Sequence, residues 1–114
     1  MKIRILIIDN EPRWIKFAQK DLNIFEIKVA RTIKEALKEL EKNKFDLVIA
    51  SSRNIKILEV ISEKYSDKRV VVTTIKPNTD EALQAYRLGA VRYFPKSFSK
   101  SDLLKQVEEV IPEK

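Results

Sequence analysis

The sequence predicts an α/β protein in which a parallel β-sheet is covered by helices on both faces. Short apolar runs alternate with amphipathic stretches five times along the chain. Three of the runs, 5–8, 47–50 and 70–72, are continuously apolar, which is typical of strands buried on both sides. Such alternation within 114 residues indicates a single three-layer domain spanning residues 1–114.

Strands are expected in chain order at 3–8, 26–30, 45–50, 69–74 and 91–94. The second and the fifth carry a charged residue inside the run, Lys28 and Arg92 respectively. Charged side chains are typical of strands at the edge of a sheet, so these two are expected at the edges.

Helices are expected between the strands. Residues 33, 36, 37 and 40 place apolar side chains at helical spacing, and a second apolar stripe runs from 103 to 111. Thr32 and Ser99 each stand three residues before an acid, which predicts that they cap the two helices that follow. Gly89, the only glycine, is predicted to end the helix over 79–88 in a left-handed conformation.

The formal net charge of +6 does not by itself predict nucleic-acid binding, because Lys and Glu alternate along the chain. Such interleaving is typical of solvated helix faces, and a Lys/Glu-rich surface also suits a thermophile. No apolar run is long enough to span a membrane. Without cysteine or histidine, disulfides, thiolate metal sites and Ser-His catalysis are excluded, and a cytoplasmic location is expected.

Polar side chains follow directly after four of the apolar runs. Ligand sites of parallel α/β sheets lie at the carboxyl ends of the strands, so these side chains are expected to converge. They are Asp9, Asn10, Glu11, Ser51, Ser52, Thr74 and Lys96.

Four segments in order, 5–12, 45–49, 70–74 and 89–98, resemble the receiver domain of response regulators. The resemblance covers nearly the whole chain. It implies a flavodoxin-like fold similar to chemotaxis regulators, with strand order 2-1-3-4-5. It also implies a role in two-component phosphorelay signal transduction, without enzyme activity.

The chain departs from the family at the residues that carry its chemistry. The resemblance implies that Asp9, Asn10 and Ser51 match three acids that hold Mg²⁺, the last being the phosphoacceptor. Asn10 and Ser51 are uncharged, so Mg²⁺ binding is expected to be weak or absent, with no catalytic residue, metal or cofactor. A serine hydroxyl also needs a base or a metal to become a nucleophile.

Other family positions are retained. Thr74 and Lys96 match the residues that contact the phosphoryl group, and Tyr93 matches the switch aromatic. Without a phosphoryl group, Lys96 is expected to pair with Asp9 or Glu11. Ser97 replaces the family's proline, which predicts a trans bond after Lys96. The link after Ser51 is short, so the third helix is expected to be shortened or re-entered.

The favoured hypothesis is a pseudo-receiver: a phosphorylation-independent module that binds a protein partner, such as an output domain, a kinase or another regulator. A homodimer is also possible. The alternatives are a functional receiver with an unusual Mg²⁺/phosphoryl site, in which Asp9 could act as base, and a basic nucleic-acid-binding domain. The resemblance implies docking through the fourth helix, fifth strand and fifth helix, where the candidate residues are Leu83, Tyr86, Arg87, Tyr93 and Lys100.

Overall fold

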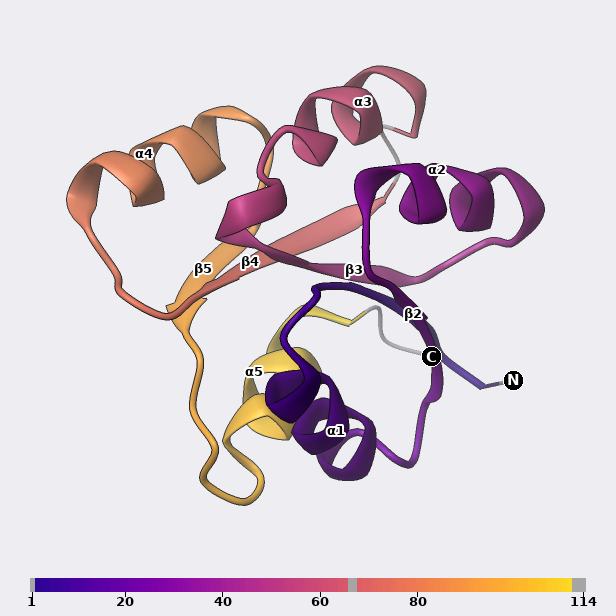
Figure 1. Ribbon diagram of the computed structural model, residues 1–114, viewed down its shortest axis with the longest axis vertical. Helices are drawn as coiled ribbons and strands as arrows, with labels where there is room; N and C mark the ends of the chain where they lie inside the picture. Colours follow the sequence, from indigo (N-terminus) through magenta and orange to yellow (C-terminus); the bar gives the residue numbers. More distant parts are fainter. Residues whose placement is uncertain (1, 66–67, 112–114) are drawn as a thin grey trace.

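The computed structural model describes residues 2–65 and 68–111, and in these the chain forms a five-stranded parallel sheet between two layers of helices (Figure 1). The strand order is β2-β1-β3-β4-β5, which confirms the predicted topology and places the two charged strands at the edges. The strands are β1 Arg4–Ile8, β2 Glu26–Ala30, β3 Leu47–Ser51, β4 Arg69–Thr74 and β5 Arg92–Pro95. The helices are α1 Pro12–Asp21, α2 Ile33–Lys42, α3 Ile57–Lys64, α4 Thr79–Arg87 and α5 Asp102–Val110, with a short 3₁₀ helix at Ser52–Asn54.

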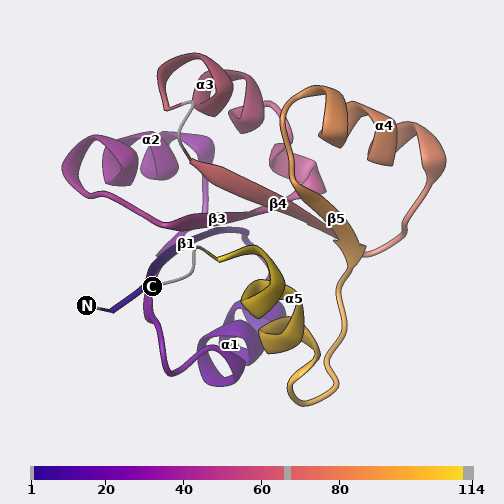
Figure 2. The ribbon, with the colours of Figure 1, turned by 180° about the vertical axis from the view of Figure 1, so that it is seen from behind.

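The helices divide unequally between the two faces of the sheet. Figures 1 and 2 show α2, α3 and α4 on one face and α1 with α5 on the other. Successive residues of β1 point to opposite faces, so Leu6 and Ile8 join one core while Ile5 and Ile7 join the other. All four are fully buried, as the continuously apolar run predicts.

Two of the predicted helix boundaries are confirmed. The Thr32 hydroxyl accepts a hydrogen bond from the Glu35 N–H at 3.1 Å and so caps α2. Gly89 follows α4 with φ +101°, a conformation that glycine adopts without steric cost.

The structure corrects the limits of three strands. β1 begins at Arg4 rather than residue 3, and β5 runs from Arg92 to Pro95, one residue later than predicted. β3 starts only at Leu47 and extends to Ser51, which pairs with Thr73 of β4. Ser51 is therefore the last residue of a central strand rather than the first of a loop, because β4 continues the ladder beside it.

The predicted cap of α5 was wrong. The helix begins at Asp102, with Ser101 at its N-cap in a left-handed conformation (φ 71°) and no capping bond from that side chain. The cap comes instead from Asp21 at the end of α1. Its two carboxylate oxygens accept hydrogen bonds from the N–H groups of Ser101 and Leu104, at 2.8 and 3.0 Å. A distant carboxylate thus takes the capping role that Ser99 was expected to take.

Candidate functional site

The predicted site residues gather at the carboxyl ends of β1, β3 and β4. Ile8, the last residue of β1, pairs with Ala50 of β3, so Asp9, directly after β1, lies at the level of Ser51, the last residue of β3. Thr74 ends β4 in the neighbouring position. Asp9, Ser51 and Thr74 are all buried, with exposed fractions of 2 %, 5 % and 3 %. The sheet therefore brings together three polar side chains that are far apart in the sequence.

Lys96 enters this site from the segment after β5. Its N–H donates to the Thr74 carbonyl at 2.8 Å, which fixes the backbone beside β4. Its ammonium lies 2.9 Å from Asp9 Oδ2 and 3.3 Å from Glu11 Oε2. The side chains of Lys96 and Asp9 are only 4 % and 3 % exposed, whereas that of Glu11 is 31 % exposed. The expected ion pair is thus present, and it involves both acids.

Asp9 also shapes the turn into α1. Its Oδ1 accepts a hydrogen bond from the Glu11 N–H at 3.1 Å, immediately before Pro12 begins the helix. Proline suits this first helical position because no partner is required for its missing N–H. The turn leaves Asn10 exposed to solvent, while Asp9 points inward. Asp9 therefore belongs to the buried site and fixes the turn, whereas Asn10 faces solvent.

The hydroxyl groups around Ser51 bond to each other and to the backbone. Ser51 Oγ accepts from the Arg53 N–H at 3.3 Å and so caps the 3₁₀ helix. Ser52 Oγ donates to Thr74 Oγ1 at 3.2 Å, a bond that ties the end of β3 to the end of β4. The short 3₁₀ helix then leads into α3, which has only eight residues, as the short link predicts.

The two carboxylates of this site are already paired. Mg²⁺ is usually held through one or two carboxylates and several waters, but Asp9 and Glu11 both lie beside the Lys96 ammonium, and Ser51 and Asn10 contribute no charge. Asp9 Oδ2 already faces the Lys96 ammonium. Within residues 2–65 and 68–111, no group of three or more His, Cys, Asp or Glu side chains is arranged to hold a metal ion.

Tyr93 points from β5 toward the start of α4. Its hydroxyl donates to Glu81 Oε1 at 2.6 Å and accepts from the Asn78 N–H at 3.2 Å. Burial raises the pKa of the Tyr93 phenol above its ordinary value of 10.0, and the Glu81 carboxylate raises it further. The Glu81 carboxylate of α4 and the N–H of Asn78, the N-cap of α4, therefore hold the Tyr93 ring in one position.

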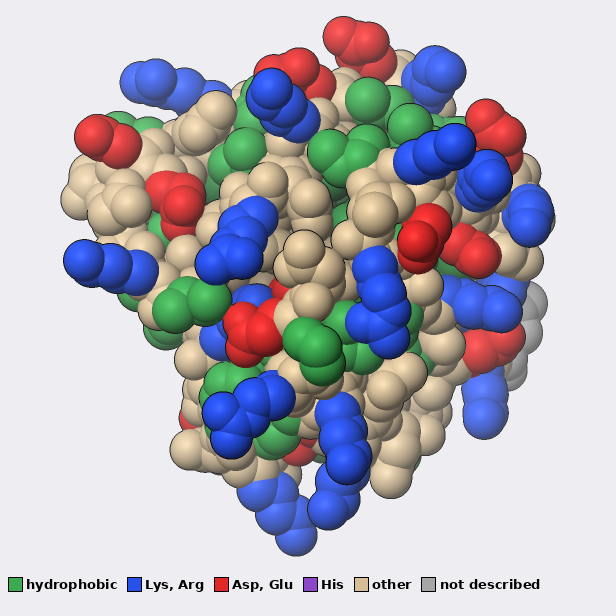
Figure 3. Space-filling model, in the orientation of Figure 1, with side chains coloured by type: hydrophobic (Ala, Val, Ile, Leu, Met, Phe, Trp, Pro, Cys, Tyr) green, Lys and Arg blue, Asp and Glu red, His purple; other side chains and the backbone are tan. Residues whose placement is uncertain are grey.

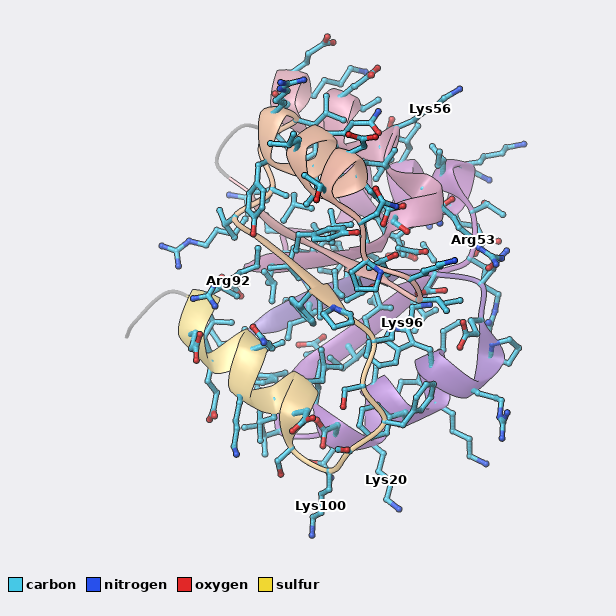
Figure 4. All side chains as sticks on the ribbon, turned by 90° about the vertical axis from the view of Figure 1, so that its left-hand side faces the viewer. Lys20, Arg53, Lys56, Arg92, Lys96 and Lys100 are labelled. Atoms are coloured by element: carbon cyan, nitrogen blue, oxygen red, sulfur yellow. The ribbon has the colours of Figure 1, made fainter. Side chains whose placement is uncertain are left out.

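The structure separates one of the five predicted partner-binding residues from the others. Leu83 and Tyr86 project from α4 with exposed fractions of 47 % and 49 %, and Arg87 is exposed on the same helix. Lys100 instead lies on the segment before α5, at the opposite end of the molecule from α4 (Figure 4). There it lines a depression together with Lys20 of α1.

Sequence reasoning missed several residues that shape the site. Trp14 of α1 lies beneath Lys96, whose ammonium is 5.6 Å from the centre of the indole ring. Glu81 and Asn78 hold Tyr93. The single tryptophan, two residues after the proline that starts α1, was a usable signal, because a large apolar ring on a helix is expected on the face that meets the sheet. The contacts of Glu81 with Tyr93 left no pattern in the sequence.

The comparisons with known proteins decide the family. The family model described as "Response regulator receiver domain" matches residues 5–108. The chain belongs to this family. It is 30 % identical over 111 residues to the two-component response regulator ORR26 of Oryza sativa subsp. japonica, covering 89 % of this chain and 19 % of that protein. It is also 29 % identical to the DNA-binding transcriptional regulator NtrC of Proteus hauseri, over 68 % of this chain and 17 % of that protein.

Solved receiver structures agree with this assignment. A response regulator from Thermotoga maritima superposes with a TM-score of 0.90 at 23 % identity, covering 97 % of this chain and 98 % of that one. The non-phosphorylated HemR receiver domain from Leptospira biflexa gives a TM-score of 0.88 at 28 % identity, covering 99 % and 97 %. The receiver fold of the two-component response regulators is therefore shown for this chain.

The chain matches nearly the whole of the two solved structures but only a small part of the curated relatives. This receiver domain spans about a fifth of the length of the curated response regulators that it matches. Among the described residues, no helix is long and apolar enough to cross a membrane.

Proposed function

We propose that this receiver domain signals without phosphorylation, as a cytoplasmic protein–protein interaction module rather than an enzyme. The observation that carries the proposal is the position of the Lys96 ammonium, between the carboxylates of Asp9 and Glu11. The side chains of Lys96 and Asp9 are almost fully buried. A cation that belongs to the chain thus neutralises the acids that remain, and Mg²⁺ binding is weak or absent.

The chemistry of Ser51 supports the same conclusion. A neutral hydroxyl attacks phosphorus only after a base or a metal ion has activated it. The chain contains no histidine, and Asp9 is held by Lys96. The Ser51 oxygen is engaged with the backbone of Arg53. Ser51 therefore serves as the cap of the 3₁₀ helix and not as a phosphoacceptor.

An exposed apolar pair on α4 supports a binding role. Leu83 and Tyr86 are about half exposed, and because they are three residues apart on α4 they lie on one face of the helix. Tyr93 of β5 is held to the same helix by its hydrogen bond to Glu81. We propose that this α4–β5 face, together with Arg87, contacts an output domain, a kinase or another regulator; a second copy of the chain would also fit an apolar patch of this kind.

A phosphorylation assay tests the proposal. The domain is incubated with Mg²⁺ and acetyl phosphate, and separately with Mg²⁺ and beryllofluoride, and the intact mass and amide NMR spectra are recorded. We expect no phosphoryl adduct and no saturable shift at Asp9, Ser51 or Lys96. A stable adduct, or saturable shifts at these three residues, would show that the domain is a functional receiver with an unusual site.

A further inference from the structure

The edge strand β5 and helix α5 border a cavity of about 400 Å³. We call it the β5–α5 cavity; it is lined by Trp14, Phe94, Leu103 and Gln106 together with polar side chains around its rim. Figure 4 shows Arg92 of β5 next to α5, where it pairs with Glu109 at 2.8 Å. Small-molecule sites in proteins commonly have volumes of about 300–1,000 Å³, and this cavity falls within that range.

The apolar wall of the cavity is built from three different elements. Trp14 comes from α1, Phe94 from β5 and Leu103 from α5, and all three are buried in the same core. The Trp14 ring is held by further aromatic contacts, since it stacks on Phe17 at 5.7 Å and meets Phe98 edge-on at 5.5 Å. A molecule in the cavity therefore meets a preformed wall with two aromatic rings, which suits a flat ring.

Two residues of this cavity carry a buried polar atom that makes no hydrogen bond. Within residues 2–65 and 68–111, five buried side-chain polar atoms lack a hydrogen-bond partner. Two of the five, Arg4 Nε and Asp9 Oδ2, are held in ion pairs. The remaining three are Trp14 Nε1, Thr73 Oγ1 and Gln106 Oε1. Trp14 and Gln106 both line the β5–α5 cavity.

The two atoms are complementary in their hydrogen-bonding character. The indole N–H of Trp14 can only donate, and the amide oxygen of Gln106 accepts. Trp14 is only 1 % exposed, so solvent at the surface does not satisfy its N–H. A buried donor or acceptor without a partner costs a fold free energy, and native proteins pair nearly all such groups. Because both residues line one cavity, a single molecule within it can pair with both.

The chemistry of these two atoms limits the class of molecule. The molecule needs an acceptor for the Trp14 N–H and a donor for the Gln106 oxygen. A carboxylate or a ketone has no donor, whereas an amide carries a carbonyl oxygen and an N–H in one planar group. An amide attached to, or part of, a ring also fits the aromatic wall formed by Trp14 and Phe94.

The charges around the cavity balance, which favours an uncharged molecule. Glu109 is neutralised by Arg92, and the other two charged residues of the rim, Asp102 and Lys105, have opposite signs. The Asp102 carboxylate also accepts a hydrogen bond from the Ser97 hydroxyl at 2.7 Å. Figure 3 shows a different surface, where Lys and Arg side chains gather over the lower part of the molecule. An anion would be drawn there rather than into the β5–α5 cavity.

We propose that the β5–α5 cavity binds a small uncharged aromatic or cyclic amide. The ring of the amide packs against Trp14 and Phe94, and its carbonyl oxygen accepts a hydrogen bond from the Trp14 indole N–H. Its own N–H donates to the Gln106 amide oxygen. This inference goes beyond the proposed function, which concerns protein contacts through α4, and does not depend on it.

An NMR titration with three matched probes tests the proposal. Trp14 is the only tryptophan, so one indole N–H resonance reports directly on its hydrogen bond. The probes are benzamide, acetophenone, which has a methyl group in place of the amide nitrogen, and benzoate, which carries a negative charge. We expect a saturable downfield shift of the indole proton with benzamide. Acetophenone is expected to bind roughly three- to tenfold more weakly, because it lacks one neutral hydrogen bond.

Two variants with a matched control assign the contacts. Gln106→Met removes the acceptor but keeps the length of the side chain, so benzamide should bind roughly three- to tenfold more weakly while acetophenone is unaffected. Trp14→Phe removes the donor and should weaken both probes, as followed by the backbone amide resonances of Phe94 and Gln106. The control, Gln84→Met on an exposed position of α4, should bind every probe like the unaltered domain.

Each contrary outcome overturns a stated part of the proposal. Equal affinities for benzamide and acetophenone, or equal effects of Gln106→Met and Gln84→Met, would overturn the pairing of Gln106 with a donor. Tighter binding of benzoate would overturn the uncharged ligand. No saturable shift with any probe would mean that only water reaches Trp14 and Gln106, and would overturn the site. The titrations contain no Mg²⁺ or phosphoryl donor, so these outcomes leave the phosphorylation-independent function untouched.

Discussion

The ammonium of Lys96 and the carboxylate of Asp9 form a buried ion pair, 2.9 Å apart, that joins the segment after β5 to the end of β1. Two charges removed from water stabilise a fold little as a pair, but either one alone is costly. The pair therefore explains how the carboxylate of Asp9 can stay buried at the end of β1.

We expect Lys96→Met to lower the free energy of unfolding by about 3–5 kcal/mol, because Asp9 would remain buried without a counter-charge. Arg92→Gln is the comparison: it breaks the Arg92–Glu109 pair at the surface, whose side chains are 40 % and 57 % exposed. That change is expected to cost less than about 1 kcal/mol. Urea unfolding followed by Trp14 fluorescence measures both, and similar costs would contradict the buried role of Lys96.

Tyr93 is expected to make stability depend on alkaline pH. Its pKa is raised in the folded state, so above the ordinary value of 10.0 the unfolded chain loses a proton that the folded chain keeps. The unfolded state then binds fewer protons, and the free energy of unfolding falls as the pH rises above that value. The stabilisation is fully present at lower pH and is lost as the pH passes through the folded pKa.

The variant Tyr93→Phe should remove this part of the alkaline loss and cost about 1 kcal/mol at neutral pH for the Glu81 hydrogen bond. Tyr86→Phe, on exposed α4, should leave both quantities unchanged. Urea unfolding followed by circular dichroism at neutral and alkaline pH compares them. An alkaline loss of the same size in Tyr93→Phe as in the unaltered domain would exclude Tyr93 as its source.

The sequence predicted the parts of the fold that depend on local patterns. Continuous apolar runs identified the buried strands, and the polar residues after them converge because parallel strands end at one edge. The long-range contacts were not predictable in this way. Ser99 and Ser101 both suit an N-cap, and the choice between them depends on Asp21, about eighty residues away along the chain.

The charge on α1 shows that an average over the whole sequence can hide a local excess of cations. Averaged over the chain, Lys and Glu alternate, and that average predicted solvated helix faces. Helix α1 departs from it, and its three cations were visible in the sequence. The sequence did not show that Phe98 beside them is exposed, or that Asp21 accepts a hydrogen bond from α5. Both features depend on how two distant segments pack.

Acids at positions 10 and 51 should create metal affinity. The double variant Asn10→Asp/Ser51→Asp raises the number of carboxylates at this end of the sheet to four, with Lys96 as the cation that pairs with Asp9 and Glu11, so the metal-free domain is expected to be less stable than the unaltered one. Added Mg²⁺ should then raise its melting temperature, while the unaltered domain shows no shift. Thermal unfolding with and without MgCl₂ measures this. An equal shift in both proteins would mean that Asn10 and Ser51 are not what weakens metal binding.

Two substitutions at the start of α5 are expected to change the free energy of unfolding in opposite directions. Ser101 holds a left-handed φ of 71° that costs a non-glycine residue free energy, and its side chain makes no capping bond. Ser101→Gly keeps the N–H that donates to Asp21 and removes the steric cost, so it should raise the free energy of unfolding by about 0.5–1 kcal/mol. Asp21→Ala leaves the N–H groups of Ser101 and Leu104 without this acceptor and should lower the free energy of unfolding by about 1–2 kcal/mol. Urea unfolding of both variants decides the matter: if Ser101→Gly is destabilising, the left-handed conformation carries no strain that glycine can relieve.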